Sequence, residues 1–288
     1  MLSNLKLIFI HGVNDQSTNY SKGLFEKIQN SLKKKLKAKG KSDSEITDIL
    51  QAVVSHNVLW ADGTTNLTNR YCQLQYQDSK LFWKSFTKKI DPLAMQIMQY
   101  IKDKGDKKTG NMNILKEVDD EIGKIFLQTN IGDFKPGEDK HAIIIAHSLG
   151  SVIAFDYVFC FRDKCRLDEN ATIHSFITMG SPIPIFTSAM GHPDSDLVLP
   201  PNVKRWVNIF SKHDGIARSA KIYFNNIDIQ EKEVFTGFFP IQSHCGYWKS
   251  DKTASIIAEE ILEVLDLQGK ETRPHLVEEK ANEAYKSK

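Results

Sequence analysis

Short apolar runs alternate with amphipathic segments of helical length along most of this chain. The runs are rich in β-branched and aromatic residues, so we expect strands at residues 5–10, 52–59, 142–146, 171–179 and 204–210. Residues 142–146 (AIIIA) are apolar throughout, which is typical of an interior strand of a parallel sheet.

Helices are expected between these strands, at residues 20–39, 148–161 and 253–267. In the first helix the apolar positions recur at fourfold spacing and the pattern stops at Gly40. These positions are Leu24, Ile28, Leu32 and Leu36. Strands that alternate with helices predict an α/β fold, with a mostly parallel central sheet covered by helices on both faces.

Residues 61–140 interrupt this alternation. They contain no convincing strand but show helical patterns at 76–90, 92–101 and 112–127. We expect a helical insertion, which either forms a lid over the strand ends or covers a face of the sheet. The prediction is one domain over residues 1–270 that includes this insertion, followed by a polar C-terminal tail at 271–288.

The composition is that of a soluble globular protein. Of the 288 residues 41% are hydrophobic and 26% charged, and 38 basic residues nearly balance 36 acidic ones, so we expect no nucleic-acid partner. No segment resembles a signal peptide or approaches the roughly 18 apolar residues of a membrane span, which favours a cytoplasmic protein. The four cysteines lack the paired spacing of a disulfide framework, so we expect them to be reduced thiols.

Lysines cluster in and after the first predicted helix, at Lys33, Lys34, Lys35, Lys37, Lys39 and Lys41. A solvated helix face is the simpler interpretation of this run, and contact with an anionic surface is the alternative.

The strongest chemical signal is the segment Ala146-His147-Ser148-Leu149-Gly150. It follows an apolar strand and opens a predicted helix, and so tight a turn needs small residues two positions before and after its serine. The serine then lies at the tip of the turn, where the amide end of the helix favours developing negative charge. We therefore expect Ser148 to be a nucleophile.

This segment resembles the nucleophile elbow of the α/β-hydrolase superfamily, and more narrowly that of its lipase and serine-esterase branch, which usually reads G-x-S-x-G. Ala146 replaces the first glycine, as in some bacterial lipases, and is still small. The resemblance extends over residues 5–267, apart from the insertion. It implies an α/β-hydrolase fold and a Ser-His-Asp triad, whose mechanism needs no cofactor; we find no metal or nucleotide motif.

The same resemblance implies an oxyanion hole. The first apolar strand ends in His11-Gly12, similar to the first oxyanion segment of the superfamily, where glycine allows a sharp turn. By this correspondence the backbone N–H groups of Val13 and Leu149 form the hole. We interpret His11 as a structural histidine that braces the loop rather than as a catalytic base.

A serine nucleophile needs a base, and the superfamily order is Ser, then Asp or Glu, then His. His244 lies in an expected loop before the last helix, in an S-H-x-x-Y-W string similar to the catalytic-histidine segment of bacterial serine esterases. His213 and His192 are the alternatives. His174 lies inside a predicted strand and His275 in the polar tail, so neither is favoured.

Asp214 is the expected acid because it lies in the loop after the strand at 204–210, about thirty residues before His244. Asp194 and Asp196, in the preceding loop, are the alternatives. The non-catalytic interpretation of Asp214 is a turn formed by an Asp-Gly pair.

The turn Gly180-Ser181-Pro182 is expected to line an acyl pocket. Ser181 is not favoured as a nucleophile, because we expect no helix to open cleanly after its proline. Four apolar residues are either a wall of this pocket or plain core: Trp60, Ile183, Ile185 and Phe186.

Together these features predict an esterase- or lipase-like serine hydrolase that cleaves a carboxylic ester or thioester through an acyl-enzyme. The expected partner is a small-molecule or lipid ester, and no pattern in the sequence sets the acyl group or the oligomeric state. The alternative is a catalytically idle domain of the same fold that serves binding or scaffolding; the presence of Ser148, Asp214 and His244 together argues against it.

Overall fold

The computed structural model describes residues 5–12, 18–60, 100, 113–127, 140–160, 171–189 and 197–266. Its centre is a six-stranded sheet in the order β2-β1-β3-β4-β5-β6, and every pairing is parallel. The strands are β1 (Leu5–Ile10), β2 (Val53–Val58), β3 (Lys140–His147), β4 (Ala171–Met179), β5 (Trp206–Phe210) and β6 (Ile229–Glu233).

The strand order places a topological switch between β1 and β3. From β1 the chain moves outward to β2 on one side, and on the other side it continues through β3 to β6. In such sheets the crevice at the carboxyl ends of the two strands at the switch is the usual binding site. Ile10 pairs with Ala146 at this point, so the predicted elbow begins beside the end of β1. The predicted α/β fold with a parallel central sheet is confirmed, and the sheet is consistent with the α/β-hydrolase fold class.

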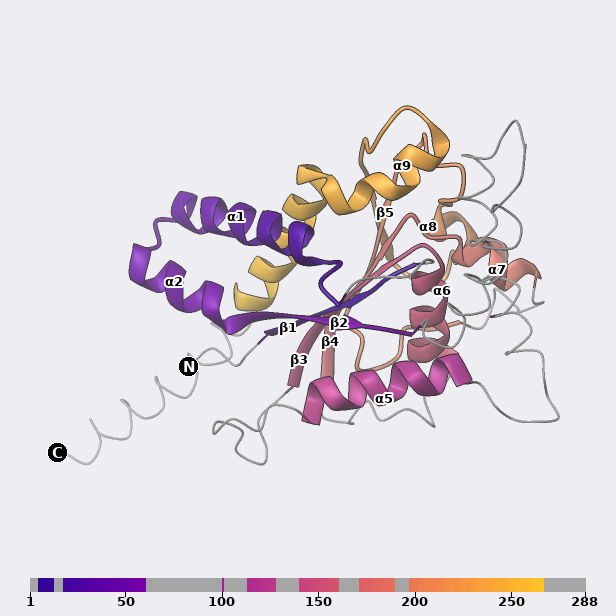
Figure 1. Ribbon diagram of the computed structural model, residues 1–288, viewed down its shortest axis with the longest axis horizontal. Helices are drawn as coiled ribbons and strands as arrows, with labels where there is room; N and C mark the ends of the chain where they lie inside the picture. The colour runs from indigo at the N-terminus through magenta and orange to yellow at the C-terminus, as the bar shows by residue number, and fades with distance from the viewer. Residues whose placement is uncertain are drawn as a thin grey trace, which may run out of the picture.

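Helices cover both faces of the sheet (Figure 1). One face carries α1 (Lys22–Ala38), α2 (Asp43–Ala52) and a helix at 251–266. The other face carries α5 (Asn113–Leu127), α6 (Leu149–Phe155) and a π-helical turn, Asp156–Cys160. The shorter helices are α7 (Ile183–Ala189), α8 (Ala220–Tyr223), α9 (Pro240–Gly246) and a 3-10 turn, Tyr247–Lys249.

Alternate residues of β3 enter two separate hydrophobic clusters, as expected for an interior strand. Ile143 and Ile145 pack with the apolar face of α1, whereas Ile144 and Ala146 pack with α5 and α6. The four apolar positions predicted for the first helix are all buried against the sheet. The strand that leads to Ser148 is thus held between two hydrophobic layers.

The structure contains elements that the sequence interpretation missed. A helix, α2, precedes β2; its signal is the capping box formed by Ser42 and Glu45. β6 reads IQEKE, and this edge strand lacks the apolar alternation on which strand prediction depends. Contrary to expectation, a helix does open after Pro182: α7 begins at the next residue, since proline is well accommodated just before or at a first helical turn.

The predicted insertion is described only in part. α5 matches the helix expected at 112–127, and it packs on the sheet beside Trp60. Tyr157 of the π-helical turn donates a hydrogen bond of 2.9 Å to Asp119 of α5. This part of the insertion therefore covers a sheet face. The helices expected at 76–90 and 92–101 lie outside the described residues, as does the tail at 271–288, except that Tyr100 is described and buried.

The lysine run is a face of α1 and its exit, and much of it is paired within the molecule. Lys35 and Lys39 contact Glu259 and Asp266 of the helix at 251–266. Lys37 and Lys41 pair with acidic residues of α2. These contacts favour the interpretation as a solvated helix face. In the described ranges, no helix has the length and apolar character needed to cross a membrane.

Candidate active site

Ser148 lies at a sharp turn between β3 and α6. Its backbone, with φ 54° and ψ −131°, is the one non-glycine backbone with positive φ within the described ranges. Such strain persists only where the surroundings enforce it, and it clusters at functional sites. A Cβ at Gly150 would lie 1.9 Å from the His11 carbonyl oxygen, which explains why the segment needs glycine there. Gly12 likewise contacts Ser148, since a Cβ on it would lie 2.7 Å from the Ser148 Cβ.

The structure brings Ser148, His244 and Asp214 together, although Ser148 and His244 are 96 residues apart. Ser148 Oγ lies 2.8 Å from His244 Nε2. On the other side of the ring, His244 Nδ1 lies 2.9 Å from Asp214 Oδ2 and 3.1 Å from Oδ1. The hydroxyl, imidazole and carboxylate therefore form a continuous hydrogen-bonded chain, in the arrangement that activates a serine.

Asp214 lies in the loop after β5, with its carboxylate inside the molecule. The backbone N–H groups of Ile216 and Ala217 donate to Oδ1 at 2.8 and 3.2 Å. Burial by itself raises the pKa of this carboxyl, but hydrogen bonding and charge from His244, together with the two amides, lower it below its ordinary value. Asp214 is therefore ionised at neutral pH and can stabilise a protonated imidazole.

His244 lies on α9 and not in the loop that we expected. Phe239, whose carbonyl accepts from the Ser243 N–H at 2.7 Å, precedes the helix, and Pro240 is its first residue. Ser243 Oγ donates to Ser211 Oγ at 3.0 Å, and so joins α9 to the end of β5. A helix positions the imidazole of His244 more rigidly than a loop would, because backbone hydrogen bonds hold the helix together.

His147, next to the candidate nucleophile, also holds α9 in place. Its Nε2–H donates to the His244 carbonyl oxygen at 2.8 Å. Burial, and then the neighbouring His244, lower the pKa of His147 to about 3, so its ring is neutral at physiological pH. The interpretation of the sequence gave this residue no role; its position inside the elbow was the available signal.

His11 has the surroundings of a bracing residue. Its Nδ1–H donates to the Gly12 carbonyl at 2.6 Å, and its ring stacks on Trp60 with centroids 5.3 Å apart. Burial lowers the pKa of His11 to about 4, against the opposing effect of the hydrogen bond to Gly12. These contacts are those of the structural histidine that we expected.

Tyr247 and Gly180 are further site residues that the sequence interpretation did not assign. The Tyr247 hydroxyl donates to Asp214 Oδ2 at 2.9 Å. Tyr247 follows His244 by three positions, and that spacing places two side chains on the same side of a helix. Gly180, at the end of β4, has φ +57° and lies directly against Tyr247, Asp214 and His244.

Some of the remaining predicted residues lie outside the described ranges, and the described histidines among them lie away from Ser148. Val13 lies outside the described residues, as do His192, Asp194 and Asp196. Leu149 is buried at the first position of α6. His213 is exposed, with its ring against Phe235 and Phe238, and His174 is paired with His141.

The candidate acyl-pocket residues are largely core. Trp60, Ile183 and Phe186 are buried in the cluster on the α5 and α6 face, whereas Ile185 is 45% exposed. Ser181 is buried, with its Oγ 2.7 Å from Ser151 Oγ and accepting from the Ile183 N–H at 3.3 Å, so its hydroxyl is hydrogen-bonded within the core.

Comparison with known proteins gives distant structural likenesses. No protein-family model matches the chain, and no curated protein sequence matches it. The chain is similar to SOBER1 from Arabidopsis thaliana, with a TM-score of 0.46 and 10% identity over 91% of this chain and 99% of the other. It is also similar to esterase PE8, with a TM-score of 0.40 and 11% identity over 90% of this chain and 93% of PE8. Such low identities leave the function to be inferred from the side chains of the site itself.

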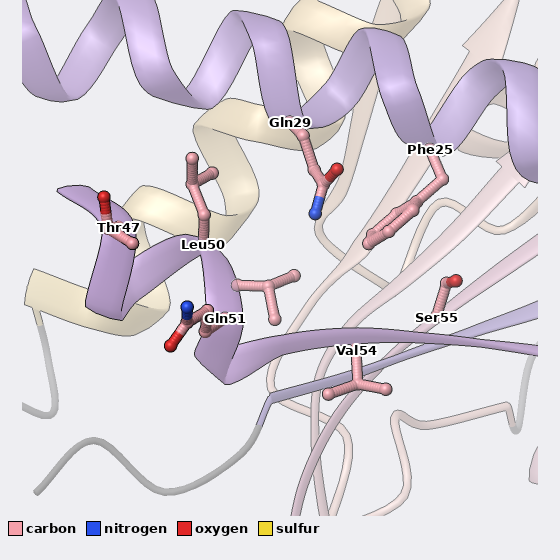
Figure 2. A pocket seen from close by; sticks show the side chains of 8 residues that line it. Phe25, Gln29, Thr47, Leu50, Gln51, Val54 and Ser55 are labelled. Atoms are coloured by element: carbon pink, nitrogen blue, oxygen red, sulfur yellow. The ribbon is translucent and has the colours of Figure 1, made fainter.

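A groove on the surface lies apart from these residues. It opens between α1, α2 and β2 at the edge of the sheet (Figure 2). Apolar side chains, two amide side chains and two hydroxyl-bearing side chains line it. These residues are Phe25, Gln29, Thr47, Leu50, Gln51, Val53, Val54 and Ser55. This lining includes none of the hydrogen-bonded site residues. Within the described ranges, no group of three or more His, Cys, Asp or Glu residues is placed to hold a metal ion.

Proposed function

We propose that the protein is a serine hydrolase that cleaves a carboxylic ester or thioester through an acyl-enzyme intermediate. The observation that carries the proposal is the unbroken chain from Ser148 Oγ through His244 to the Asp214 carboxylate, with links of 2.8 and 2.9 Å. The chain starts from a serine held in a strained backbone at the switch point of the sheet.

In the proposed reaction His244 Nε2 takes the Ser148 proton as Oγ attacks the carbonyl carbon. The ionised Asp214 stabilises the imidazolium and keeps the Nδ1 proton on its own side of the ring. His244 then gives its proton to the departing alcohol or thiol. A water molecule, deprotonated by His244, next attacks the acyl group, and the acid leaves as Ser148 regains its proton.

The negative charge of the tetrahedral intermediate requires donors near Ser148. We assign this role to the backbone N–H of Leu149, the first residue of α6, and, as the sequence resemblance implies, to that of Val13. Removing one such donor lowers kcat by roughly 10²–10³ in enzymes of this type, so the hole supplies a large part of the acceleration. Since both donors are main-chain groups, the side chains of these two residues are free to vary.

A fluorophosphonate probe tests the proposal, since it labels only an activated serine. We expect wild-type protein to be labelled at Ser148 and Ser148→Ala to remain unlabelled, with ester hydrolysis reduced by roughly four orders of magnitude or more. Ser188→Ala is the matched control, because Ser188 is an exposed serine on α7. Labelling that persists in Ser148→Ala would move the nucleophile elsewhere, and unlabelled wild type would leave a binding or scaffolding domain.

The substrate class needs a separate measurement. p-Nitrophenyl esters of increasing acyl length, each paired with the thioester of the same acid, compare kcat/KM for the two leaving groups and define the acyl preference. Hydrolysis of neither series by a protein that the probe labels would direct the search to amide substrates.

A further inference from the structure

The hydroxyl of Tyr247 extends the polar chain of the site at the end opposite Ser148. Its Oη lies 2.9 Å from Asp214 Oδ2 and 2.9 Å from the backbone nitrogen of Ser211. The tyrosine ring is fully buried, in the cluster that β5 and the helix at 251–266 share. This hydroxyl takes no part in the acyl transfer described above.

The direction of both hydrogen bonds follows from what each partner can do. The Ser211 N–H can only donate, so Oη accepts there; an ionised Asp214 can only accept, so the single Oη proton points to Oδ2. Burial, and then the charge and hydrogen bond of Asp214, raise the pKa of Tyr247 well above its ordinary value. The tyrosine therefore keeps its proton and remains a donor.

Each oxygen of Asp214 is consequently held by donors from two directions. Oδ2 accepts from Tyr247 and from His244 at 2.9 Å each, and Oδ1 accepts from the amides of Ile216 and Ala217. The two amides fix the carboxylate from its own loop. Tyr247 donates from the 3-10 turn that directly continues α9, the helix that carries His244.

We infer that Tyr247 is a positioning residue of the proposed triad. Its hydroxyl fixes the Asp214 carboxylate against His244 and takes up part of its negative charge, so that the His–Asp pair gains a proton at lower pH than it would without this donor. The inference rests on the proposed function, because it concerns the pH range over which His244 can act as a base.

Two other histidines, His147 and His11, lie near the His244–Asp214 pair. His147 approaches from the end of β3, with its ring centroid 4.9 Å from that of His244. Its pKa of about 3 keeps it neutral over the range in which a serine hydrolase works. The charge of His11 acts on His147, and burial lowers the pKa of His11 to about 4. Among the described residues, Tyr247 is thus the titratable donor bonded directly to the carboxylate besides His244 itself.

Tyr247→Phe tests the inference by removing only the hydroxyl. We expect kcat to fall about tenfold with KM within about twofold, the size expected for losing a hydrogen bond to a charged group. We also expect the acidic limb of the kcat/KM profile to move to higher pH by about half a unit or more. Tyr157→Phe is the matched control, since it removes another buried Tyr–Asp hydrogen bond of 2.9 Å, on the opposite face of the sheet; it should not move the limb.

A second variant covers the case in which Tyr247→Phe does not fold. 3-Fluorotyrosine placed at position 247 alone keeps the ring and the hydroxyl, and its more acidic hydroxyl is a stronger donor. The acidic limb should then move to lower pH, opposite to the shift in Tyr247→Phe. A residue that acted only by filling space would give neither shift.

NMR titration of the His244 ring repeats the comparison without substrate, so the inference does not depend on finding the natural ester. The inference is overturned if the titration midpoints and the acidic limbs stay at their wild-type pH in both variants. In that case, Ser148-dependent hydrolysis by the wild type still leaves the proposed function intact. Absence of that hydrolysis, with the midpoints shifted as expected, removes the proposed function alone.

Discussion

Gly180 lies behind the polar side chains of the site, where the structure leaves no room for a side chain. A Cβ there would be 2.8 Å from Tyr247 Cε2, 3.1 Å from Asp214 Oδ2 and 3.3 Å from His244 Nδ1. Its φ of +57° is also unfavourable for any residue with a Cβ. At the scale of single residues, the geometry of the site thus requires glycine at position 180.

If the proposed function holds, Gly180→Ala should reduce ester hydrolysis at least tenfold, because displacing the carboxylate or the imidazole by a fraction of an ångström disturbs the alignment that the proposed reaction needs. Gly40→Ala is the matched control, since Gly40 also has positive φ, +77°, but a Cβ there meets no atom within 4 Å. Both variants should lose about 1 kcal/mol of stability from backbone strain, and Gly180→Ala should lose more because its Cβ also meets Tyr247 and Asp214. Steady-state kinetics and urea denaturation of the two variants separate the effects. Equal kcat in both would show that Gly180 does not constrain the site.

At the scale of elements, α2 shows how local capping establishes a helix that tertiary contacts then use. The Ser42 side chain accepts from the Glu45 N–H at 3.3 Å, while the Glu45 carboxylate accepts from the Ser42 N–H at 2.9 Å. Lys41 and Ser42 lower the pKa of Glu45 to about 2, so the box is intact at neutral pH. The helix then buries Ile46 and Ile49 and leads directly into β2.

Ser42→Ala should cost about 1 kcal/mol of unfolding free energy, because an N-cap acceptor for an otherwise unpaired backbone N–H is lost. Ser44→Ala, at the second position of the same helix and exposed, should leave stability nearly unchanged, since Ser44 is not the N-cap and alanine has a high helix propensity. Urea unfolding monitored by circular dichroism measures both. A Ser42→Ala protein as stable as Ser44→Ala would mean that packing alone sets the start of α2.

At the scale of the whole molecule, two buried neutral histidines couple stability to pH. His11 and His147 have folded-state pKa values of about 4 and about 3, lowered by burial from the ordinary 6.5. Well above pH 6.5 both histidines are neutral in the folded and in the unfolded chain, so they do not make the free energy of unfolding depend on pH. Below pH 6.5 the unfolded chain binds protons that the folded chain does not, so stability falls as pH falls from 6.5 through about 4.

Each such histidine adds a slope of up to about 1.4 kcal/mol per pH unit in that window. We expect the urea midpoint to decline steeply between pH 6.5 and 4.5, and His147→Gln to decline less steeply. Glutamine can place an amide donor near the position of Nε2 without titrating, so the hydrogen bond to the His244 carbonyl can be retained. Parallel pH profiles for the wild type and His147→Gln would contradict this account.

The sequence by itself determined the sheet strands β1 to β5, the helix α1 and the position of the elbow at Ser148. These features depend on residues close together in the chain: the period of apolar positions, and the small residues needed at a tight turn. β6 escaped prediction because it is a polar edge strand, and α9 because its pattern is too short to signal a helix.

Only the tertiary structure decided the contacts between distant side chains, although chain order and the resemblance had already named Asp214 and His244 as partners of Ser148. It brought Asp214 and His244 to Ser148, because the parallel strands end at one edge of the sheet and their loops converge there. The catalytic roles of these three residues, and of the Val13 and Leu149 amides, stay proposals. Tyr247, His147 and Gly180 joined the site through contacts across separate elements, which no local pattern encodes.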